Sequence, residues 1–245
     1  MPDNVFDSCS NHAVLCAAGA GCDHSACNEG AFIIASAGVE CHEYDSLQAD
    51  ACFVSSETGV LDGPDGVYLD SKRYRLEEGR AAVLVGGTLY FVCRNAALLR
   101  YHVLGTQDLS VIGPPPGKFR GSRTIVTRVE NGGLGLATLR RDVLQLWSAE
   151  TGRDGDVKWA KMNRIHLRKL MTYKSPARLI GFVGDINVVS VRSDDHGIFT
   201  IELKSLLTKK VCEMDDKVVG DIFPYVCYST PAGTTSSTSS YMFGY

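Results

Sequence analysis

A short apolar run that ends in a polar turn recurs along this chain at nearly constant spacing, which limits the folds that the chain can adopt. The runs read CFVSSETG at residues 52–59, LLRYHVLG at 98–105, LQLWSAETG at 144–152 and IFTIELKS at 198–205. The glycines that close the first three runs are 46 and 47 residues apart, and the fourth run ends 53 residues later. Strand-and-turn units that repeat every ~40 to 50 residues are typical of β-propeller blades. The spacing therefore predicts an all-β, propeller-like fold.

The three closing glycines are expected to reverse the chain. Gly59, Gly105 and Gly152 suit a turn with positive φ, which glycine adopts without steric cost. The Ser and Thr residues that precede two of them can hydrogen-bond to the local backbone. We therefore expect the SSETG and SAETG sequences at residues 55–59 and 148–152 to be turns.

The β-rich runs between these turns can be grouped into about four blades of four strands each. Gly86-Gly87 is a strong hairpin signal in the second group, and three prolines end its last strand. Residues 167–173 are predicted to form a short helix, and 222–228 one further strand. The predicted strands, blade by blade, are 14–17, 32–35, 52–55 and 67–69; 82–85, 89–93, 98–103 and 109–112; 124–129, 134–139, 143–147 and 157–167; and 179–183, 187–191, 198–203 and 209–212.

Length and composition are those of one globular domain. The 245 residues, with 44% hydrophobic and 22% charged residues, suffice for a sizeable core. We expect a single propeller-like domain over residues 14–230, an incomplete or open ring of about four blades. Residues 1–13 are predicted to be a disordered N-terminus, and the Ser/Thr-rich residues 231–245 a disordered tail.

Charge and hydropathy exclude several classes of partner. The net charge of −3 and the pI near 6.1 give no electrostatic reason to expect nucleic acid or an anionic membrane. No apolar stretch has the length of a membrane span, and the first ten residues lack the features of a signal peptide. An intracellular location, cytoplasmic or nuclear, is therefore expected, with the nine cysteines as reduced thiols.

Candidate chemistry is limited to one cysteine-rich segment. Cys16, Cys22, His24 and Cys27 could hold zinc if the loop folded back, although their spacing lacks the paired C-x2-C pattern. A loop with reduced thiols is the favoured interpretation, so no metal and no cofactor is predicted. No nucleophile elbow, phosphate-binding loop or metalloprotease motif is present, and no catalytic residue is predicted.

Loops are the expected places for function, because rigid strands can present variable side chains there. Residues 22–30, 61–66, 154–156 and 193–197 are the candidate loops, and their sequences do not rank them. Aromatic residues in the β-rich runs are assigned to the core. The basic pairs Arg140-Arg141 and Lys209-Lys210 are interpreted as hairpin tips.

The quoted motifs, taken in order, resemble a known family. Besides the runs above, they are CDH at residues 22–24 followed by Cys27, LVGGTLYF at 84–91, LSVIGPPP at 109–116, GGLGLAT at 132–138, and KVCE and IFPYVCYSTP near the end. Over residues 14–231 the chain resembles the F-box-associated β-propeller proteins of grasses. It departs from their pattern at His102 and at Met171-Thr172. It also shows no F-box type helical segment before residue 14.

The resemblance implies the substrate-recognition half of a ubiquitin-ligase receptor. We therefore expect a non-enzymatic protein-interaction domain that recognises an unidentified protein partner. Docking onto the Skp1 adaptor is not expected, because that contact needs the F-box. Two alternatives remain: a metal-binding or enzymatic protein that uses the N-terminal Cys/His cluster, and a truncated relic. Open sheet edges predict self-association.

Overall fold

The computed structural model describes residues 10–41 and 47–213 with gaps, and two strands beyond them. In full, the described residues are 10–18, 30–41, 47–69, 74–77, 80–117, 119, 123–152, 156–183, 187–213, 223–226 and 241–244, with backbone alone at 10, 41, 223–226 and 241–244. Cys22, His24 and Cys27 lie outside them. Within this described part, no helix has the length and apolar character needed to cross a membrane.

Antiparallel strands form four larger sheets and one two-stranded sheet. In the first sheet β1 (Ser10–Cys16), β2 (Phe32–Cys41) and β3 (Leu47–Ser55) pair in order, and both β4 (Leu61–Asp62) and β5 (Val67–Leu69) pair with β3. The second sheet contains β6 (Val83–Val85), β7 (Thr88–Val92), β8 (Leu98–Tyr101) and β9 (Leu109–Ile112). The third contains β10 (Thr124–Arg128), β11 (Leu134–Arg140), β12 (Val143–Thr151) and β13 (Val157–His166). The fourth contains β14 (Ala177–Val183), β15 (Val188–Ser193), β16 (Gly197–Glu202) and β17 (Thr208–Cys212), and β18 (Phe223–Val226) pairs with β19 (Tyr241–Gly244).

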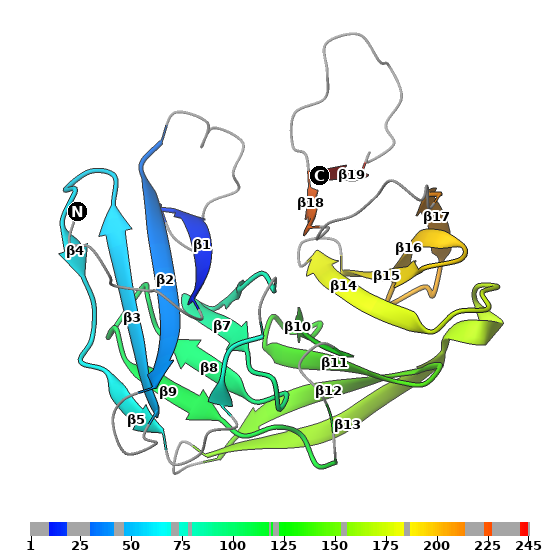
Figure 1. Cartoon of the computed structure of the whole chain (residues 1–245), viewed down its shortest axis with the longest axis horizontal. Coiled ribbons are helices and arrows are strands. Elements are labelled where there is room, and N and C mark those ends of the chain that lie inside the picture. The colour runs from blue at the N-terminus through cyan, green and yellow to red at the C-terminus, as the bar shows by residue number, and fades with distance from the viewer. Residues whose placement is uncertain are drawn as a thin grey trace, which may run out of the picture.

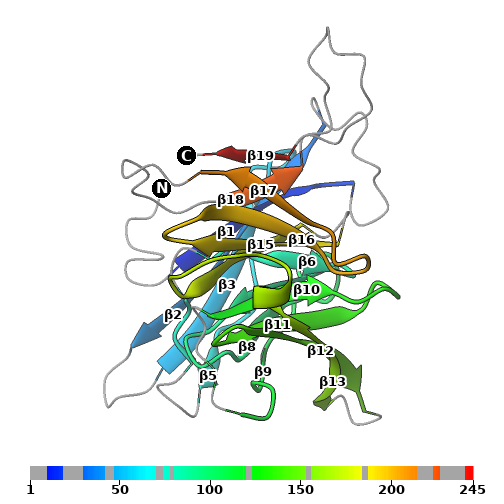
Figure 2. The same cartoon turned by 90° about the vertical axis from the view of Figure 1, so that its right-hand side faces the viewer.

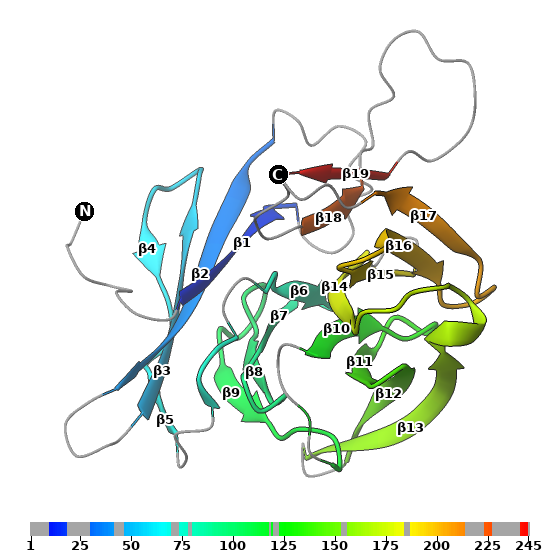
Figure 3. The ribbon, with the colours of Figure 1, turned by 45° about the vertical axis from the view of Figure 1, so that its right-hand side comes forward.

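The sheets follow one another around a common centre (Figure 1). Their first strands, β6, β10 and β14, lie toward this centre, whereas β9, β13 and β17 lie at the periphery (Figure 3). Strand β10 contacts both β6 and β14, and β14 contacts β18. Figure 2 views this arrangement from the side of the fourth sheet. The predicted all-β, propeller-like arrangement of blades is confirmed, and the described strands do not close into a barrel.

Alternation of side chains along each strand explains why the sheets stack. On β7, Leu89 and Phe91 pack against the first sheet, while Tyr90 and Val92 pack against the third. Successive residues of a strand point to opposite faces, so a sheet between two neighbours must be apolar on both. This accounts for the uninterrupted burial of β7, all five residues of which are buried.

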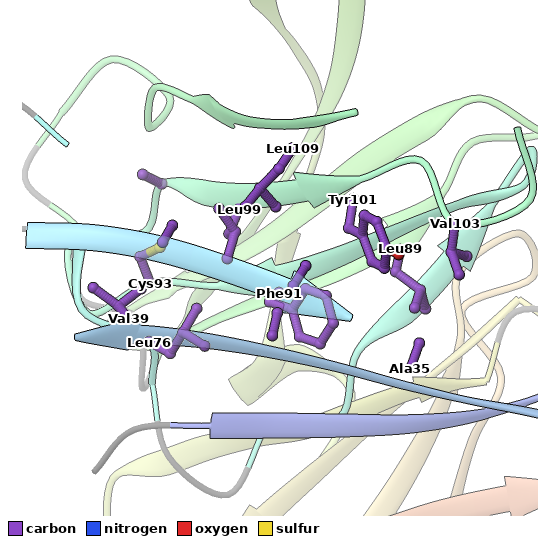
Figure 4. Packing of buried hydrophobic residues seen from close by; sticks show 14 of the residues in the cluster. Ala35, Val39, Leu76, Leu89, Phe91, Cys93, Leu99, Tyr101, Val103 and Leu109 are labelled. Atoms are coloured by element: carbon purple, nitrogen blue, oxygen red, sulfur yellow. The ribbon is translucent and has the colours of Figure 1, made fainter. Parts of the chain in front are cut away.

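Each pair of neighbouring sheets encloses its own hydrophobic cluster. The cluster between the first and second sheets includes Phe91 and Tyr101, which Figure 4 shows among their aliphatic neighbours. Trp147 belongs to the cluster between the second and third sheets, and Phe199 to that between the third and fourth. The aromatic residues that were assigned to the core therefore lie between blades, as expected.

Two arginines join the inner strands of different sheets. The Nη1 of Arg80 donates to the carbonyl oxygens of Leu179 and Ile180 on β14, at 2.8 and 3.1 Å. The Nη2 of Arg128 on β10 donates to the Leu84 carbonyl oxygen on β6, at 2.7 Å. Hydrogen bonds from a charged donor are among the stronger ones in proteins, so these contacts help to hold the sheets in register around the centre.

The recurring runs correspond to equivalent strands, but their turns differ. Each run lies on the third strand of its sheet, namely β3, β8, β12 or β16. The expected left-handed glycine occurs only at Gly59, with φ of 65°; Gly105 and Gly152 do not adopt positive φ. The prediction of a turn at residues 148–151 was wrong, because β12 continues through Thr151 and pairs with β13.

Several element boundaries also differ from the prediction. Only a 3-10 turn, η6 (Leu167–Lys169), occurs where a short helix over residues 167–173 was expected, because burial of Leu167, Met171 and Tyr173 between sheets draws the chain into an extended path. Lys209-Lys210 lie inside β17 rather than at a hairpin tip. Strand β1 begins before residue 14, and β19 lies within the segment predicted to be a tail.

The outer face of the first sheet exposes apolar residues. Val14, Ile34 and Val54 are cross-strand partners on β1, β2 and β3, and Val14 and Ile34 are 71% and 42% exposed. The opposite face of this sheet packs on the second sheet in the first cluster. Within the described residues no sheet packs on the outer face, which is apolar like the faces that bury one another elsewhere in the stack.

We expect this apolar face to contribute to self-association, in addition to the open sheet edges. We expect the molecular mass measured by light scattering to rise with protein concentration, and Ile34→Asp to return the protein toward the monomer because a carboxylate on this face opposes burial. Leu207→Asp is the control. It introduces the same charge at a position that lies outside the first sheet and is 69% exposed. A wild-type protein that stays monomeric at high concentration would contradict the prediction.

Candidate functional site

The structure tests the predicted Cys/His cluster only at Cys16. This residue lies on β1 opposite Phe32, half-buried, while the other three members fall outside the described residues. Among the residues that are described, no group of three or more His, Cys, Asp or Glu side chains could hold a metal ion. The zinc alternative for residues 16–27 therefore stays a prediction.

Of the four candidate loops, two can be followed. Residues 61–66 are mostly exposed and begin with the short strand β4. Residues 193–197 connect β15 to β16. In the other two loops only Gly30 and Asp156 are described.

Asp195 organises the loop between β15 and β16. One of its carboxylate oxygens accepts hydrogen bonds from the backbone N–H groups of Lys174 and Ser175, at 2.6 and 3.0 Å. The other accepts from the hydroxyls of Ser175, at 2.5 Å, and Ser193. His196 Nδ1 lies 2.8 Å from this carboxylate. Ser, His and Asp thus meet here, but the carboxylate uses both hydroxyls to join the start of β14 to the β15–β16 hairpin.

These bonds make the loop sensitive to acid. Partial burial raises the pKa of Asp195, but hydrogen bonds from Ser175 and Ser193 and from backbone N–H groups outweigh it, and the pKa lies well below its usual range. A depressed carboxylate pKa stabilises the fold above the unfolded-state pKa of about 3.9 and loses this effect as pH falls below it. We expect Asp195→Asn to lower the melting temperature at pH 7, with a gap to wild type that narrows below about pH 4.

Asp194→Asn is the matched control for this prediction. Asp194 adjoins Asp195 but forms exposed ion pairs with Arg178 and Arg192, which contribute little to stability in water. Melting curves of both variants across pH measure the difference. An Asp195→Asn protein with wild-type stability at neutral pH would contradict the role given to this carboxylate.

A cleft of about 510 Å3 opens between the third sheet and the segment that links β9 to β10. We call it the cationic cleft. Its lining residues are Pro116, Gly117, Phe119, Thr138, Arg140, Arg141, Val143, Gln145, Trp147, Lys161 and Arg164.

The floor of the cationic cleft continues a face that is apolar deeper in the molecule. The strand register pairs Leu136 with Trp147, Thr138 with Gln145, and Arg140 with Val143. Cross-strand partners share a face of a sheet, so the side of the third sheet that packs on the second changes from apolar to basic along its length. On β13, Arg164 lies opposite Gln145 and Lys161 opposite Trp147, across a register shift between those two β12 residues.

Trp147 connects the cleft to the hydrophobic core. Its side chain is buried, and its indole N–H donates to the Thr138 hydroxyl at 2.9 Å. The ring of Phe119 meets it edge to face, with centroids 5.9 Å apart, and the Lys161 ammonium lies 5.8 Å from its centroid. Three separate contacts thus fix the base of the cleft.

Glycine is required where the linking segment passes Phe119. Gly117 has φ of 137°, a conformation that other residues rarely adopt, and a Cβ at this position would lie 2.7 Å from Phe119 Cε2. The glycine therefore permits the close approach of Phe119 that forms one wall of the cleft.

Positive charge dominates the lining. Four of the lining residues are Arg or Lys, and none of the described ones is Asp or Glu. The nearest carboxylate in the sequence, Asp142, is held elsewhere: it pairs with Arg168 at 2.6 Å and accepts a hydrogen bond from the Tyr173 hydroxyl at 2.9 Å. These partners lower the pKa of Asp142, with the Arg168 hydrogen bond as the main cause. The cleft is suited to bind anions.

Sequence reasoning missed this cleft. The pair Arg140-Arg141 was correctly placed at a hairpin tip, between β11 and β12. Lys161 and Arg164 come from another strand, and an irregular register aligns them with the pair, so no sequence motif joins the four. The available sequence signal was the alternation along residues 143–147, which places Val143, Gln145 and Trp147 on the same face of their strand.

The chain matches no model of a known protein family, and no curated protein matches its sequence.

Proposed function

We propose that the chain is a non-enzymatic protein-interaction domain, and that the cationic cleft receives a segment of its partner. The observation that supports this most directly is the cleft itself, whose volume lies within the ~300 to 1,000 Å3 typical of binding pockets. It is formed mainly by strands packed in a stack of sheets, which fixes the backbone positions that carry the lining side chains.

Three of the described nucleophiles are not free to react, which supports a binding role rather than catalysis. Burial raises the pKa of the Cys93 thiol to about 12, so it stays protonated at neutral pH. The hydroxyls of Ser175 and Ser193 are engaged by Asp195. This proposal agrees with the resemblance to the substrate-recognition propellers of F-box proteins. Residues 14–230 are not proposed to contact the Skp1 adaptor.

A variant that fills the cleft tests the proposal without changing its charge. Peptides selected from a random display library on the immobilised chain are expected to bind the wild-type protein and to lose binding to Val143→Trp, because the larger side chain occupies the cleft. Val60→Trp adds the same ring at a position between β3 and β4 that is 60% exposed, and it serves as the control.

Two results would overturn the proposal. One is recovery of no peptide that binds saturably. The other is equal binding of the selected peptides to the wild-type protein and to Val143→Trp, provided that the variant melts at the wild-type temperature.

A further inference from the structure

We infer that the cationic cleft selects an acidic peptide segment in which an apolar side chain lies between anionic ones. This inference rests on the function proposed above and names the chemistry of the partner. It follows from the unpaired charges of the cleft, from its apolar wall and from its size.

The first argument concerns cations without partners. Arg140 ends β11, Arg141 follows in the left-handed conformation with φ of 56°, and Arg164 lies on β13. Within the described residues none of these three guanidinium groups forms an ion pair. Like charges that line one cleft repel one another, and more strongly near a protein surface than in bulk water. An anion between them removes this repulsion and accepts their hydrogen bonds.

The second argument is that the described lining of the cleft contains no anion. Arg168 and Tyr173 engage Asp142, the acidic residue that follows the pair directly. The positive potential of the cleft is therefore not neutralised from within the lining. Planar guanidinium groups bind carboxylates and phosphates through paired N–H donors, which gives such a site geometric selectivity.

The third argument is the apolar wall. Phe119 and Val143 are half-buried and Pro116 is exposed, and all three line the same cleft as the arginines. An aliphatic side chain of the ligand would remove these surfaces from water, which favours binding. A site of this kind distinguishes a peptide with both features from a simple anion.

Size and overall charge favour a peptide over a nucleic acid. A long polyanion needs an extended basic surface, whereas this chain has a net charge of −3 and the described lining of the cleft contributes four cations. The cleft volume of about 510 Å3 accommodates a few side chains. Anionic groups of a peptide can come from Glu or Asp or from phosphorylated residues, and the experiment distinguishes these sources.

The test uses defined peptides and fluorescence anisotropy. Three labelled peptides share a central Leu: one has Glu on both sides, one has phosphoserine there, and one has Gln. We expect both anionic peptides to bind at least about tenfold more tightly than the Gln peptide, with affinity that falls as salt is added. The ratio between the Glu and phosphoserine peptides identifies the source of the anion.

Charge reversal provides the matched comparison. Arg140→Glu combined with Arg164→Glu should weaken the anionic peptides at least about tenfold. Lys169→Glu combined with Lys204→Glu makes the same change in net charge at exposed positions outside the cleft and should leave binding unchanged. Measurement of the melting temperature of both double variants separates lost binding from lost folding.

The outcomes separate this inference from the proposed function. One outcome would overturn the inference and leave the interaction function intact. In it, display-selected peptides lose binding to Val143→Trp, but their binding does not change with salt or in the Arg140→Glu, Arg164→Glu protein. Equal effects of the two double variants, or tighter binding of a single-stranded oligonucleotide than of the acidic peptide, would also overturn it. Failure of every peptide to bind would overturn both.

Discussion

Replacement of Phe91 by alanine is expected to lower the free energy of unfolding by about 3 to 5 kcal/mol. Phe91 is 1% exposed and packs between the first and second sheets (Figure 4). Loss of the ring removes its apolar contacts and leaves a cavity that rigid strands on both sides cannot fill. In a domain of this size the melting temperature should fall by about 10 °C.

Thermal unfolding followed by circular dichroism measures this effect. Leu207→Ala, at a site that is 69% exposed, is the control and should change stability by no more than about 0.5 kcal/mol. If Phe91→Ala unfolds at the wild-type temperature, the first sheet does not pack on the second as described.

Replacement of Gly197 by alanine is expected to lower the free energy of unfolding by at least about 3 kcal/mol, from two combined causes. Gly197 has φ of 99°, which strains any residue with a Cβ. An added Cβ would also overlap the Cys212 carbonyl oxygen on the neighbouring strand β17 and lie 3.2 Å from the Glu213 Cα. Because both contacts are with backbone, the start of β16 and the end of β17 must separate.

Gly132→Ala isolates the steric part of this effect. Gly132 has φ of 80°, but nothing lies within 4 Å of a Cβ placed there, so only the backbone strain of about 1 to 2 kcal/mol is expected. Denaturant titrations of the two variants provide the comparison. Equal destabilisation would show that β17 does not pack on Gly197 in the way described.

The sheet order could be predicted from the sequence because it depends on local signals. Alternating apolar residues, Gly86-Gly87 and the three prolines after Ile112 mark strands and hairpins without reference to the rest of the chain. The equal spacing of the third strands then indicated repeated sheets. The predictions of element boundaries failed where contacts between segments distant in sequence determine the structure. Thr151 stays in β12 because β13 pairs with it, and Leu167 is held in a 3-10 turn by burial between two sheets.

The candidate site could not be predicted, because it depends on register. Its four basic residues meet only through the pairing of β11, β12 and β13. Arg140-Arg141 lie on a hairpin, and Lys161 and Arg164 lie on another strand. A register shift between Gln145 and Trp147 decides which face Lys161 occupies, and a shift of one residue would place it on the opposite face. Loop composition, on which the expected functional positions rested, contains no information about this alignment.

The central claim is that the cationic cleft receives an acidic partner segment. Its most direct test is an NMR titration with the Glu peptide that follows the two indole N–H signals. Trp147 forms the base of the cleft, whereas the Trp159 indole donates to the Gly113 carbonyl oxygen at 2.8 Å and does not line it. We predict a saturable shift of the Trp147 signal with little change at Trp159, and loss of that shift in the Arg140→Glu, Arg164→Glu protein. A peptide that binds without moving the Trp147 signal would contradict the claim.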